Sequence, residues 1–435
     1  MNMKKLTFIT ILLLNIVAAM AVENYPYRSD FLWVTTPDHS DWLYKTGENA
    51  NVEVQLFKYG YPADAKVDYE IAQDMMPASK KGSVSLKNGK ATINLGTRKE
   101  PGFTDLALCA TIDGETTRHH IKVGYDVDKI QPFTKMPQDF KNFWQETLDE
   151  MHKTPLSYTR ELAKEYCTDK IDCWLIKLRI DKEHSMYGYL FMPKDSEGKK
   201  LPAAFSPPGA GVKTIKYPMR HKYYPEEGFI RLEVEIHGLD PRLSEGTFKE
   251  ITSAFASKQN GYFTNRIDNR EAYYLRHVYA GMVRWTDFLC SLPEWDGKNL
   301  AVQGGSQGGA LAIVTAALDP RVTACCVNHP ALTDMAGYTD KGRTGGYPHF
   351  KPEVLTPQVV NVLQYYDVIN FCRIINCPVR MTWGYNDNVC PPTTSYAAWN
   401  TLTVPKERVI TPVNEHWTSE QMEYEHMLWI KSKLD

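Results

Sequence analysis

Residues 300–313 read Leu-Ala-Val-Gln-Gly-Gly-Ser-Gln-Gly-Gly-Ala-Leu-Ala-Ile, and this stretch decides which fold the chain can adopt. The apolar residues at its start predict a buried strand, and the small and apolar residues at its end predict a helix. Ser306 lies between them, where the chain must turn sharply and expose the hydroxyl. Gly304 and Gly308 occupy the two positions at which a side chain would clash. Gly-x-Ser-x-Gly in this context predicts a nucleophilic serine.

Strand and helix patterns alternate on both sides of this turn. Helical patterns cover 270–292, 395–402 and 419–433. Such alternation is typical of a mainly parallel sheet with helices on both faces, whose functional groups lie at the carboxyl ends of the strands. The strands that we predict are 173–180, 186–191, 203–206, 230–236, 300–304, 322–327, 379–383 and 408–411.

Two further residues complete a catalytic set with the serine. Asp387 directly follows the strand at 379–383, and His416 follows the last predicted strand. A serine hydroxyl becomes a good nucleophile when a base accepts its proton, and a carboxylate orients an imidazole for that task. The order serine, aspartate, histidine is that of the α/β-hydrolase fold. We therefore expect Ser306 to be the nucleophile, His416 the general base, and Asp387 the residue that orients the histidine.

Three other residues compete for these roles. Glu415 could act as the acid, but it adjoins His416, and a neighbour in sequence normally points away. His426 falls inside the predicted C-terminal helix, which favours a packing or surface position. His237 lies at a strand end as well, but it precedes the serine in the chain. We expect His237 to line the substrate pocket or to brace a loop.

A carbonyl group that the serine attacks needs N–H donors for its developing negative charge. The backbone N–H of Gln307 is the first candidate, because this residue directly follows the nucleophile. The second is Ala210 in the glycine-rich loop 207–211, for which a simple turn is the alternative interpretation. Tyr385 and Trp417 flank the acid and the base, and each is expected either to form an apolar pocket wall or to pack in the core.

The first part of the chain has a different periodicity of apolar and polar residues. Apolar and polar residues alternate in short runs such as 52–56, 67–71 and 106–112. This period of two predicts half-buried strands, so residues 22–130 are expected to form a small β-sandwich of immunoglobulin-like design. Residues 131–435 are then expected to form an α/β-hydrolase catalytic domain. Its segment 331–370 is rich in Gly, Tyr and Pro and is predicted to form a cap over the pocket.

The first residues have the pattern of a secretory signal peptide. Lys4 and Lys5 precede an apolar run over 6–18 and the triplet Ala-Met-Ala at 19–21. The run is shorter than the roughly 20 residues that a membrane-spanning helix needs. We therefore expect cleavage of residues 1–21, no stable membrane anchor, and export to the periplasm or the extracellular space.

Composition excludes several function classes. The net charge is −2 and no block of like charges occurs, so nothing points to nucleic acid or to an anionic membrane. Neither Cys-x2-Cys nor His-Glu-x-x-His is present, which argues against a metal site. Of the nine cysteines, Cys167 with Cys173 and Cys372 with Cys377 are close enough in sequence for disulfides in an oxidising compartment. The disulfide pairing and the oligomeric state stay open at this point.

From residue 137 onward the chain resembles the acetyl xylan esterase and cephalosporin-C deacetylase family, carbohydrate esterase family seven. The resemblance rests on Pro-Gln-Asp-Phe at 137–140, on the serine turn and Ala-Leu-Asp-Pro-Arg-Val at 317–322, and on Asp-Asn-Val-Cys-Pro-Pro-Thr at 387–393. It implies the α/β-hydrolase fold and ester hydrolysis without a cofactor. It also implies the roles already given to the three catalytic residues and to the Gln307 N–H.

The chain departs from the family pattern around the pocket. His237 stands where the family has arginine, and Ala210 stands where it has tyrosine. At the base, the family's His-Glu is replaced by Glu415-His416-Trp417. The N-terminal β-sandwich is an addition. These departures leave the catalytic residues in place and concern the choice of substrate and the assembly.

The predicted activity is the removal of a short acyl group, such as acetyl, from a carbohydrate or a related small-molecule or oligosaccharide ester. One rival is a serine peptidase of the prolyl oligopeptidase type, which has the same catalytic order. Such enzymes carry a large N-terminal propeller, which about 100 residues of strands cannot build. Another rival is a non-catalytic glycan-binding protein on a hydrolase scaffold. It would more often have lost a catalytic residue, and none is missing here.

Overall fold

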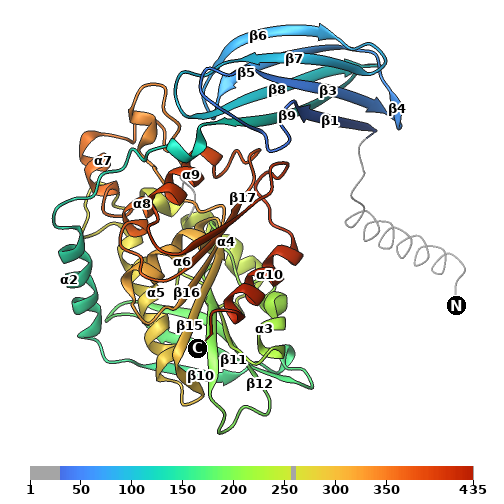
Figure 1. Ribbon diagram of the computed structural model, residues 1–435. Coiled ribbons are helices and arrows are strands. Elements are labelled where there is room, and N and C mark those ends of the chain that lie inside the picture. The colour runs from blue at the N-terminus through green and yellow to red at the C-terminus, as the bar shows by residue number, and fades with distance from the viewer. Residues whose placement is uncertain (1–29, 256–260, 435) are drawn as a thin grey trace, which may run out of the picture.

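The computed structural model describes residues 30–255 and 261–434, and the predicted signal peptide lies outside these ranges. Two small sheets, built from the first part of the chain, lie on one end of a large sheet that is covered by helices (Figure 1). The strands in blue form the small sheets, and the green to red part of the chain forms the rest.

The large sheet has nine strands in the order β10-β11-β12-β14-β13-β15-β16-β17-β18. The pairs from β14 to β18 are all parallel, and the pairs at the β10 end are antiparallel. The mainly parallel sheet that the sequence predicts is thus confirmed. The bounds are β10 (Tyr158–Leu162), β11 (Ile171–Arg179), β12 (Ser185–Pro193), β13 (Leu201–Ser206), β14 (Ile230–Val234), β15 (Trp295–Gly305), β16 (Ala324–Asn328), β17 (Val379–Trp383) and β18 (Lys406–Ile410).

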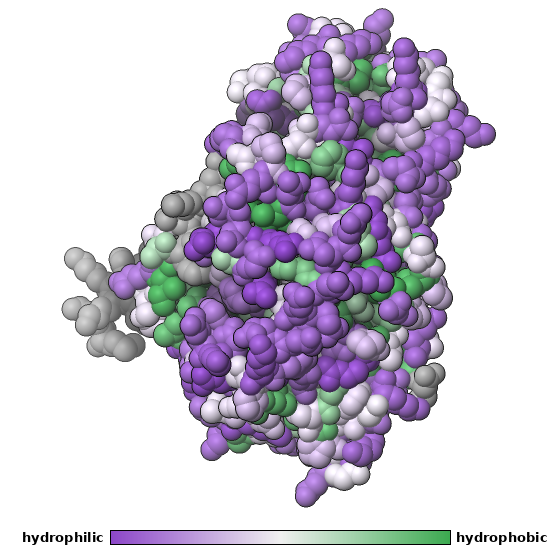
Figure 2. Space-filling view, turned by 90° about the vertical axis from the view of Figure 1, so that its left-hand side faces the viewer, coloured by the Kyte–Doolittle hydropathy of each residue, from purple (hydrophilic) through white to green (hydrophobic). Residues whose placement is uncertain are grey.

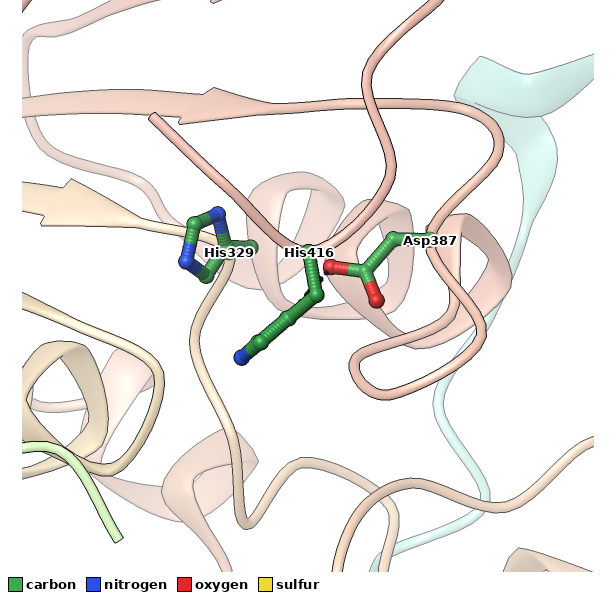
Figure 3. A group of neighbouring side chains, drawn as sticks. All are labelled: His329, Asp387 and His416. Carbon is green, nitrogen blue, oxygen red and sulfur yellow. Dashed lines mark hydrogen bonds and ion pairs between the residues drawn. The ribbon is translucent and has the colours of Figure 1, made fainter. Parts of the chain in front are cut away.

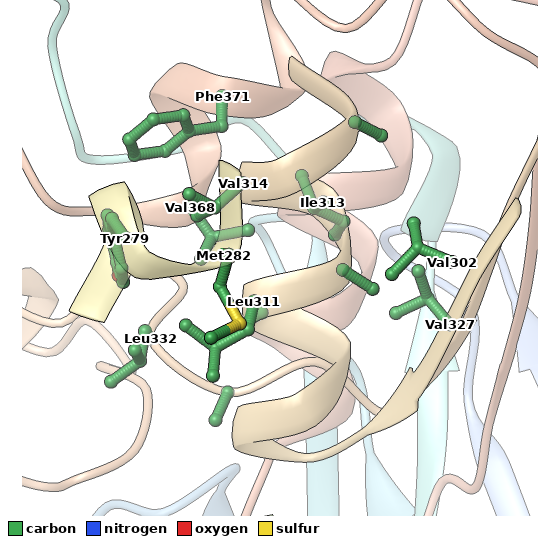
Figure 4. Close-up of a cluster of buried hydrophobic side chains, with 14 of the residues drawn as sticks. Tyr279, Met282, Val302, Leu311, Ile313, Val314, Val327, Leu332, Val368 and Phe371 are labelled. Carbon is green, nitrogen blue, oxygen red and sulfur yellow. The ribbon is translucent and has the colours of Figure 1, made fainter. Parts of the chain in front are cut away.

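Helices cover both faces of this sheet because its central strands are apolar on both sides. Ala203 and Phe205 belong to the core on one face, while Ala204 between them belongs to the core on the other. The larger core is drawn in Figure 4, where α6 lies between the sheet and two further helices. Its helices include α2 (Phe140–His152), α5 (Tyr274–Ser291), α6 (Gln307–Leu318), α8 (Val368–Cys372) and α9 (Pro392–Thr401); α3 (Tyr223–Glu226) and α10 (Glu420–Lys431) cover the opposite face.

The N-terminal sheets share one core of alternating residues, so they form a β-sandwich. Val52, Val54 and Leu56 are fully buried on one sheet, and Leu106 and Ile121 are fully buried on the other. The first sheet contains β1 (Phe31–Pro37), β3 (Ala50–Lys58), β4 (Tyr61–Pro62) and β7 (Lys90–Gly96). The second contains β2 (Leu43–Tyr44), β9 (Glu115–Tyr125), β8 (Gly102–Ile112), β5 (Lys66–Gln73) and β6 (Ala78–Ser85).

The junction between the sandwich and the rest of the chain is packed. A single turn of 3-10 helix, η1 (Val127–Lys129), follows β9 directly. The side chain of Asn400 on α9 donates to the carbonyls of Val127 and Ile130 at 2.9 and 3.0 Å. Asp128 forms an ion pair with Arg408 at 2.7 Å. The connecting segment is therefore fixed onto the hydrolase part.

Residues between β16 and β17 form the insertion that the sequence singles out. It contains η5 (Gly337–Thr339) and α7 (Pro357–Leu363) before α8. Ala331 at its start donates its N–H to the carbonyl of Ser306 at 3.0 Å. The insertion thus begins beside the serine, and its role as a cap stays a prediction. The remaining helix of more than one turn, α4 (Glu245–Phe255), lies on the chain after β14.

All nine cysteines are free thiols, so neither proposed disulfide is formed. The face drawn in Figure 2 is largely hydrophilic, and its apolar side chains occur in small scattered groups. No helix within 30–255 and 261–434 has both the length and the apolar character needed to cross a bilayer.

Candidate active site

Ser306 occupies a sharp turn between β15 and α6. Its backbone has φ 58° and ψ −124°, a left-handed conformation that is rare for a residue other than glycine. Gly304 and Gly308 make the turn possible. A Cβ atom on Gly304 would lie 2.2 Å from the carbonyl oxygen of Gly308, and one on Gly308 would lie 2.4 Å from that of Pro207. The structure therefore shows why both glycines are needed.

His416 and Asp387 meet the serine from two later strand ends. The Nε2 atom of His416 lies 3.0 Å from Ser306 Oγ, and its Nδ1 lies 2.8 Å from Asp387 Oδ2. The second carboxylate oxygen of Asp387 accepts the N–H groups of Val389 and Cys390 at 2.7 and 2.8 Å. Asp387 is fully buried, and the His416 side chain is 25% exposed. This geometry suits proton transfer from the serine to the histidine.

The surroundings favour an ionised Asp387. Burial alone raises the pKa of this carboxyl, but the hydrogen bond and the charge of His416 outweigh it and hold the pKa below its ordinary value. His329 follows β16, and its ring lies 4.3 Å from that of His416 (Figure 3). Burial lowers the pKa of His329 to about 4, so this second imidazole is neutral at pH 7. A neutral neighbour adds no charge to oppose protonation of His416.

The loop after β13 is tied to the serine turn. Tyr262 donates its hydroxyl to the side-chain oxygen of Gln307 and accepts the N–H of Gly211 at 3.2 Å. The side-chain nitrogen of Gln307 donates to the carbonyl of Pro208 at 3.2 Å. Among residues 30–255 and 261–434, no protein oxygen accepts the backbone N–H of either Gln307 or Ala210. Both predicted oxyanion donors are thus left available.

Comparison with protein families decides the class of protein. A model of the family described as acetyl xylan esterase (AXE1) matches residues 125–433. The chain belongs to this family. An acetyl esterase of Xylanibacter ruminicola, Axe7A, is 56% identical over 435 residues, which make up 100% of this chain and 98% of that protein. This family member is therefore a carboxylic ester hydrolase.

Solved structures agree with that assignment. An acetyl xylan esterase from Paenibacillus sp. R4 superposes with a TM-score of 0.62 and 26% identity, covering 71% of this chain and 98% of its own. Acetyl Xylan Esterase 1 from Thermoanaerobacterium sp. JW/SL YS485 gives a TM-score of 0.60 at 22% identity with the same coverage, which shows the fold alone. The predicted α/β-hydrolase fold is confirmed for this family member.

The rivals for the catalytic roles have other partners. Glu415 points to the sandwich, where its Oε1 lies 3.7 Å from His120 Nε2. His426 is fully buried in α10, and its Nε2 lies 2.6 Å from Asn328 Oδ1. His237 braces a loop: its Nε2 lies 3.3 Å from the Gly211 carbonyl, and its Nδ1 lies 2.6 Å from the Tyr274 hydroxyl.

The two aromatic residues beside the acid and the base differ in environment. Tyr385 is buried, and its ring packs 5.1 Å from Phe103 of the sandwich. Its hydroxyl lies 3.1 Å from that of Tyr396. This arrangement fits the packing alternative and not the pocket wall. Trp417, the residue after His416, is 54% exposed, so its ring is accessible from solvent.

Two residues near the triad are given no role by the sequence, although Cys390 belongs to the stretch 387–393 on which the family resemblance rests. His329 is a single histidine after a strand, which is a weak signal without the neighbouring His416. Cys390 lies in the loop of Asp387, and its N–H donates to that carboxylate at 2.8 Å. Burial raises the pKa of the Cys390 thiol well above its ordinary value, and the nearby Ser306 hydroxyl offsets only part of the rise. This cysteine therefore stays a neutral thiol beside the serine.

The same cluster has the spacing of a metal site. One atom from each of His329, Asp387 and His416 lies within 4.8 Å of the others. However, both ring nitrogens of His416 are already engaged, one by Asp387 and one by Ser306. A metal ion would have to break these contacts. The contacts therefore favour the catalytic interpretation of the cluster.

Proposed function

We propose that this family member is a serine esterase that removes acetyl or another short acyl group from a carbohydrate. The observation that carries the proposal is the continuous chain of contacts from Ser306 through His416 to Asp387, at 3.0 and 2.8 Å. A serine, a base and an orienting carboxylate in this geometry form the minimal set for acyl transfer.

The reaction has two steps. Ser306 Oγ attacks the ester carbonyl carbon while His416 Nε2 accepts the hydroxyl proton, and the N–H groups of Gln307 and Ala210 stabilise the oxyanion. The tetrahedral intermediate then expels the alcohol, which takes the proton from His416 and leaves an acyl-serine. Water next attacks the acyl-serine with the same histidine as base, which releases the acid and restores the serine.

Two observations support a carbohydrate ester as the substrate. Axe7A, which is similar along its whole length, is named an acetyl esterase, and the Paenibacillus protein is named an acetyl xylan esterase. Trp417 follows His416 directly in the chain and its side chain is exposed, and an aromatic face of this kind packs well against the apolar face of a sugar. An acetylated xylooligosaccharide is therefore the substrate to test first.

A variant pair tests the serine mechanism. Ser306→Ala should lower kcat for 4-nitrophenyl acetate by about 10⁴-fold or more, because the nucleophile is lost. Ser83→Ala changes an exposed serine on β6 of the sandwich and should leave kcat unchanged. Circular dichroism should show equal folding for both variants. Turnover that persists in Ser306→Ala would overturn the proposal.

Substrate competition tests the two rivals. Acetate release from acetylated xylooligosaccharides should exceed cleavage of proline-containing peptide amides by several orders of magnitude. The reverse preference would support a peptidase. Binding of the oligosaccharide without release of acetate would support a non-catalytic glycan-binding protein.

We also propose that the enzyme is exported. The pattern of a charged start, an apolar run and small residues at 19–21 supports this proposal. When the full chain is expressed in a Gram-negative host, the protein should be recovered in the periplasm or the medium with a new N-terminus after Ala21. An intact N-terminus on protein that stays in the cytoplasm would contradict export.

A further inference from the structure

A residue of the sandwich contacts the loop of the catalytic acid. Lys122 on β9 is fully buried, and its Nζ donates to the backbone carbonyl of Asp387 at 2.8 Å. The backbone N–H of the same lysine donates to Asn386 Oδ1 at 2.9 Å. Lys122 thus binds both the catalytic acid and the residue before it.

Asp74, just after β5, completes this contact. Its side chain is also fully buried, and its Oδ1 lies 2.8 Å from Lys122 Nζ, which neutralises the lysine charge. Its Oδ2 accepts the N–H and the hydroxyl of Thr393 at 3.3 and 2.6 Å. Thr393 lies in the first turn of α9, six residues after the catalytic acid. The ion pair therefore holds the segment 386–393 at both ends.

The burial of this pair indicates a function other than stability. Removing two charges from water costs several kcal/mol for each, and apolar residues of similar size often serve the fold as well. A further contact between the sandwich and the hydrolase part of the chain points the same way. His120 lies two residues before Lys122, and its Nε2 is 3.7 Å from Glu415, the residue before His416. The sandwich thus contacts the loops of both the acid and the base.

We propose that Lys122 and Asp74 are positioning residues for the reaction. Lys122 fixes the carbonyl of Asp387, and this fixes the backbone from which the Asp387 carboxylate reaches His416. Both residues precede residue 125, where the match to the family model begins. The added sandwich is then a working part of the active site. This inference rests on the proposed function, since it assigns Asp387 the role of orienting the base.

The test uses a double variant, because Lys122→Met alone would leave the Asp74 charge buried without a partner. Lys122→Met with Asp74→Asn removes both charges and keeps the size of the side chains. We expect kcat for 4-nitrophenyl acetate to fall 10- to 100-fold, with KM changed less than threefold. Lys58→Met with Asp113→Asn is the control, because this sandwich ion pair has the same 2.8 Å distance but makes no hydrogen bond to the loop of Asp387. The control should keep the wild-type kcat.

The pH profile separates positioning from a structural role. An Asp387 carboxylate that is no longer fixed stabilises the charge on its partner base less, so the acid limb of kcat/KM moves to lower pH. We expect a shift of at least half a unit in the double variant. Lys122→Arg keeps a charged donor beside Asp74. Its kcat and its acid limb should therefore both lie closer to the wild-type values than those of the double variant.

Several results would overturn the inference. The first is a double variant with the kcat of the wild type and an unshifted acid limb of kcat/KM. The second is a double variant whose activity falls only in proportion to the amount of folded protein, again with an unshifted acid limb. If the double variant does not fold, Thr393→Val provides the milder test, because it removes the hydroxyl bound to Asp74 and keeps the shape. It should lower kcat about threefold, and no change would count against the proposal. Failure of the serine mechanism itself would appear separately, as activity in Ser306→Ala.

Discussion

Ser306 is held in its left-handed conformation by three backbone hydrogen bonds. Its N–H donates to the carbonyl of Asn328 at 3.0 Å, and its own carbonyl accepts the N–H groups of Ala310 and Ala331, both at 3.0 Å. A non-glycine residue in this region stores strain, which persists only where the surroundings fix it. The Ser306 backbone is therefore fixed before any substrate binds.

Tyr262 is the residue through which the oxyanion loop is joined to the serine turn. Tyr262→Phe removes the hydroxyl that binds both Gln307 and Gly211 and retains the ring. Loss of one direct oxyanion donor costs about 10²–10³ in kcat, so this indirect loss should cost about tenfold. Steady-state kinetics on 4-nitrophenyl acetate would measure it, with KM little changed. A change confined to KM would instead assign Tyr262 to substrate binding.

At the scale of single residues, the grouping of Ser306, His416 and Asp387 could be predicted from the sequence, and the contacts that hold these residues in place could not. Ser306 imposes glycines on its neighbours, so its role leaves a local pattern. Lys122 leaves no local pattern in the sequence, because the carbonyl that it binds belongs to Asp387, 265 positions further along the chain. Tyr385 is misleading for a related reason: it adjoins the acid loop in sequence, but its side chain points into the junction with the sandwich.

Among the structural elements, the loops after β17 and β18 are packed against each other. The N–H of Asn386 donates to the carbonyl of Asn414 at 3.2 Å, and that of Tyr385 donates to the carbonyl of Pro412, also at 3.2 Å. Gly384 permits this approach, since a Cβ atom there would lie 2.0 Å from the Asn414 carbonyl oxygen. The distance between acid and base is thus set by contact between the two loops.

Gly384→Ala should separate these loops. The backbone must move to admit the methyl group, so we expect a loss of about 2 kcal/mol in the free energy of unfolding. Displacement of a catalytic group by about 1 Å can cost about 10²-fold in rate, and kcat should fall to a similar extent. Gly246→Ala, on exposed α4 with no close neighbour, is the control and should be neutral or slightly stabilising. Urea unfolding and steady-state kinetics on both variants would test this prediction. If Gly384→Ala were as stable and as active as Gly246→Ala, close contact between the two loops would not set the distance between Asp387 and His416.

Elements with a clear apolar pattern were predictable, and exposed ones were not. The predicted strand at 379–383 matches β17, and the predicted helix at 270–292 contains α5. β10 is exposed at all five positions, so it offers no alternation to detect. β6 contains two adjacent lysines and a glycine and is mostly exposed as well. Such edge strands depend on their partners, which the local sequence does not specify.

Across the whole molecule, several buried or half-buried histidines make stability depend on pH. Burial lowers the pKa of each to about 4, against an ordinary value of 6.5, so the unfolded chain binds more protons between these values. Their contribution to stability is fully present above pH 6.5 and is lost as the pH falls toward 4. Glu235 and Asp367 act in the opposite sense, because burial raises the pKa of each to about 7. The histidines concerned are His119, His237, His277, His329 and His426.

His349 acts like these five histidines, while His39 and His221, whose pKa is raised, act like Glu235 and Asp367. Six groups therefore oppose four, and the free energy of unfolding should fall between pH 6.5 and pH 4.5. His426→Gln tests one of the five, because His426 is fully buried and its neutral form bonds to Asn328. The variant should lose stability at pH 7, and the gap to the wild type should narrow by up to about 1.4 kcal/mol per unit as the pH is lowered. Urea unfolding at several pH values would measure this gap. A gap that is constant with pH would rule out the contribution of His426.

The packed junction at Val127–Lys129 has a consequence for how the enzyme can be divided. Where a flexible tether joins two modules, either can be cut away or exchanged, and the catalytic module works alone. Here the hydrogen bonds from Asn400 and the ion pair between Arg408 and Asp128 fix the connecting segment to the hydrolase part. A protein engineer who trims the first hundred residues would expose the back of the acid loop to water. The sandwich and the hydrolase part should therefore be kept together in any engineered version, because the sandwich supports the loop that carries Asp387.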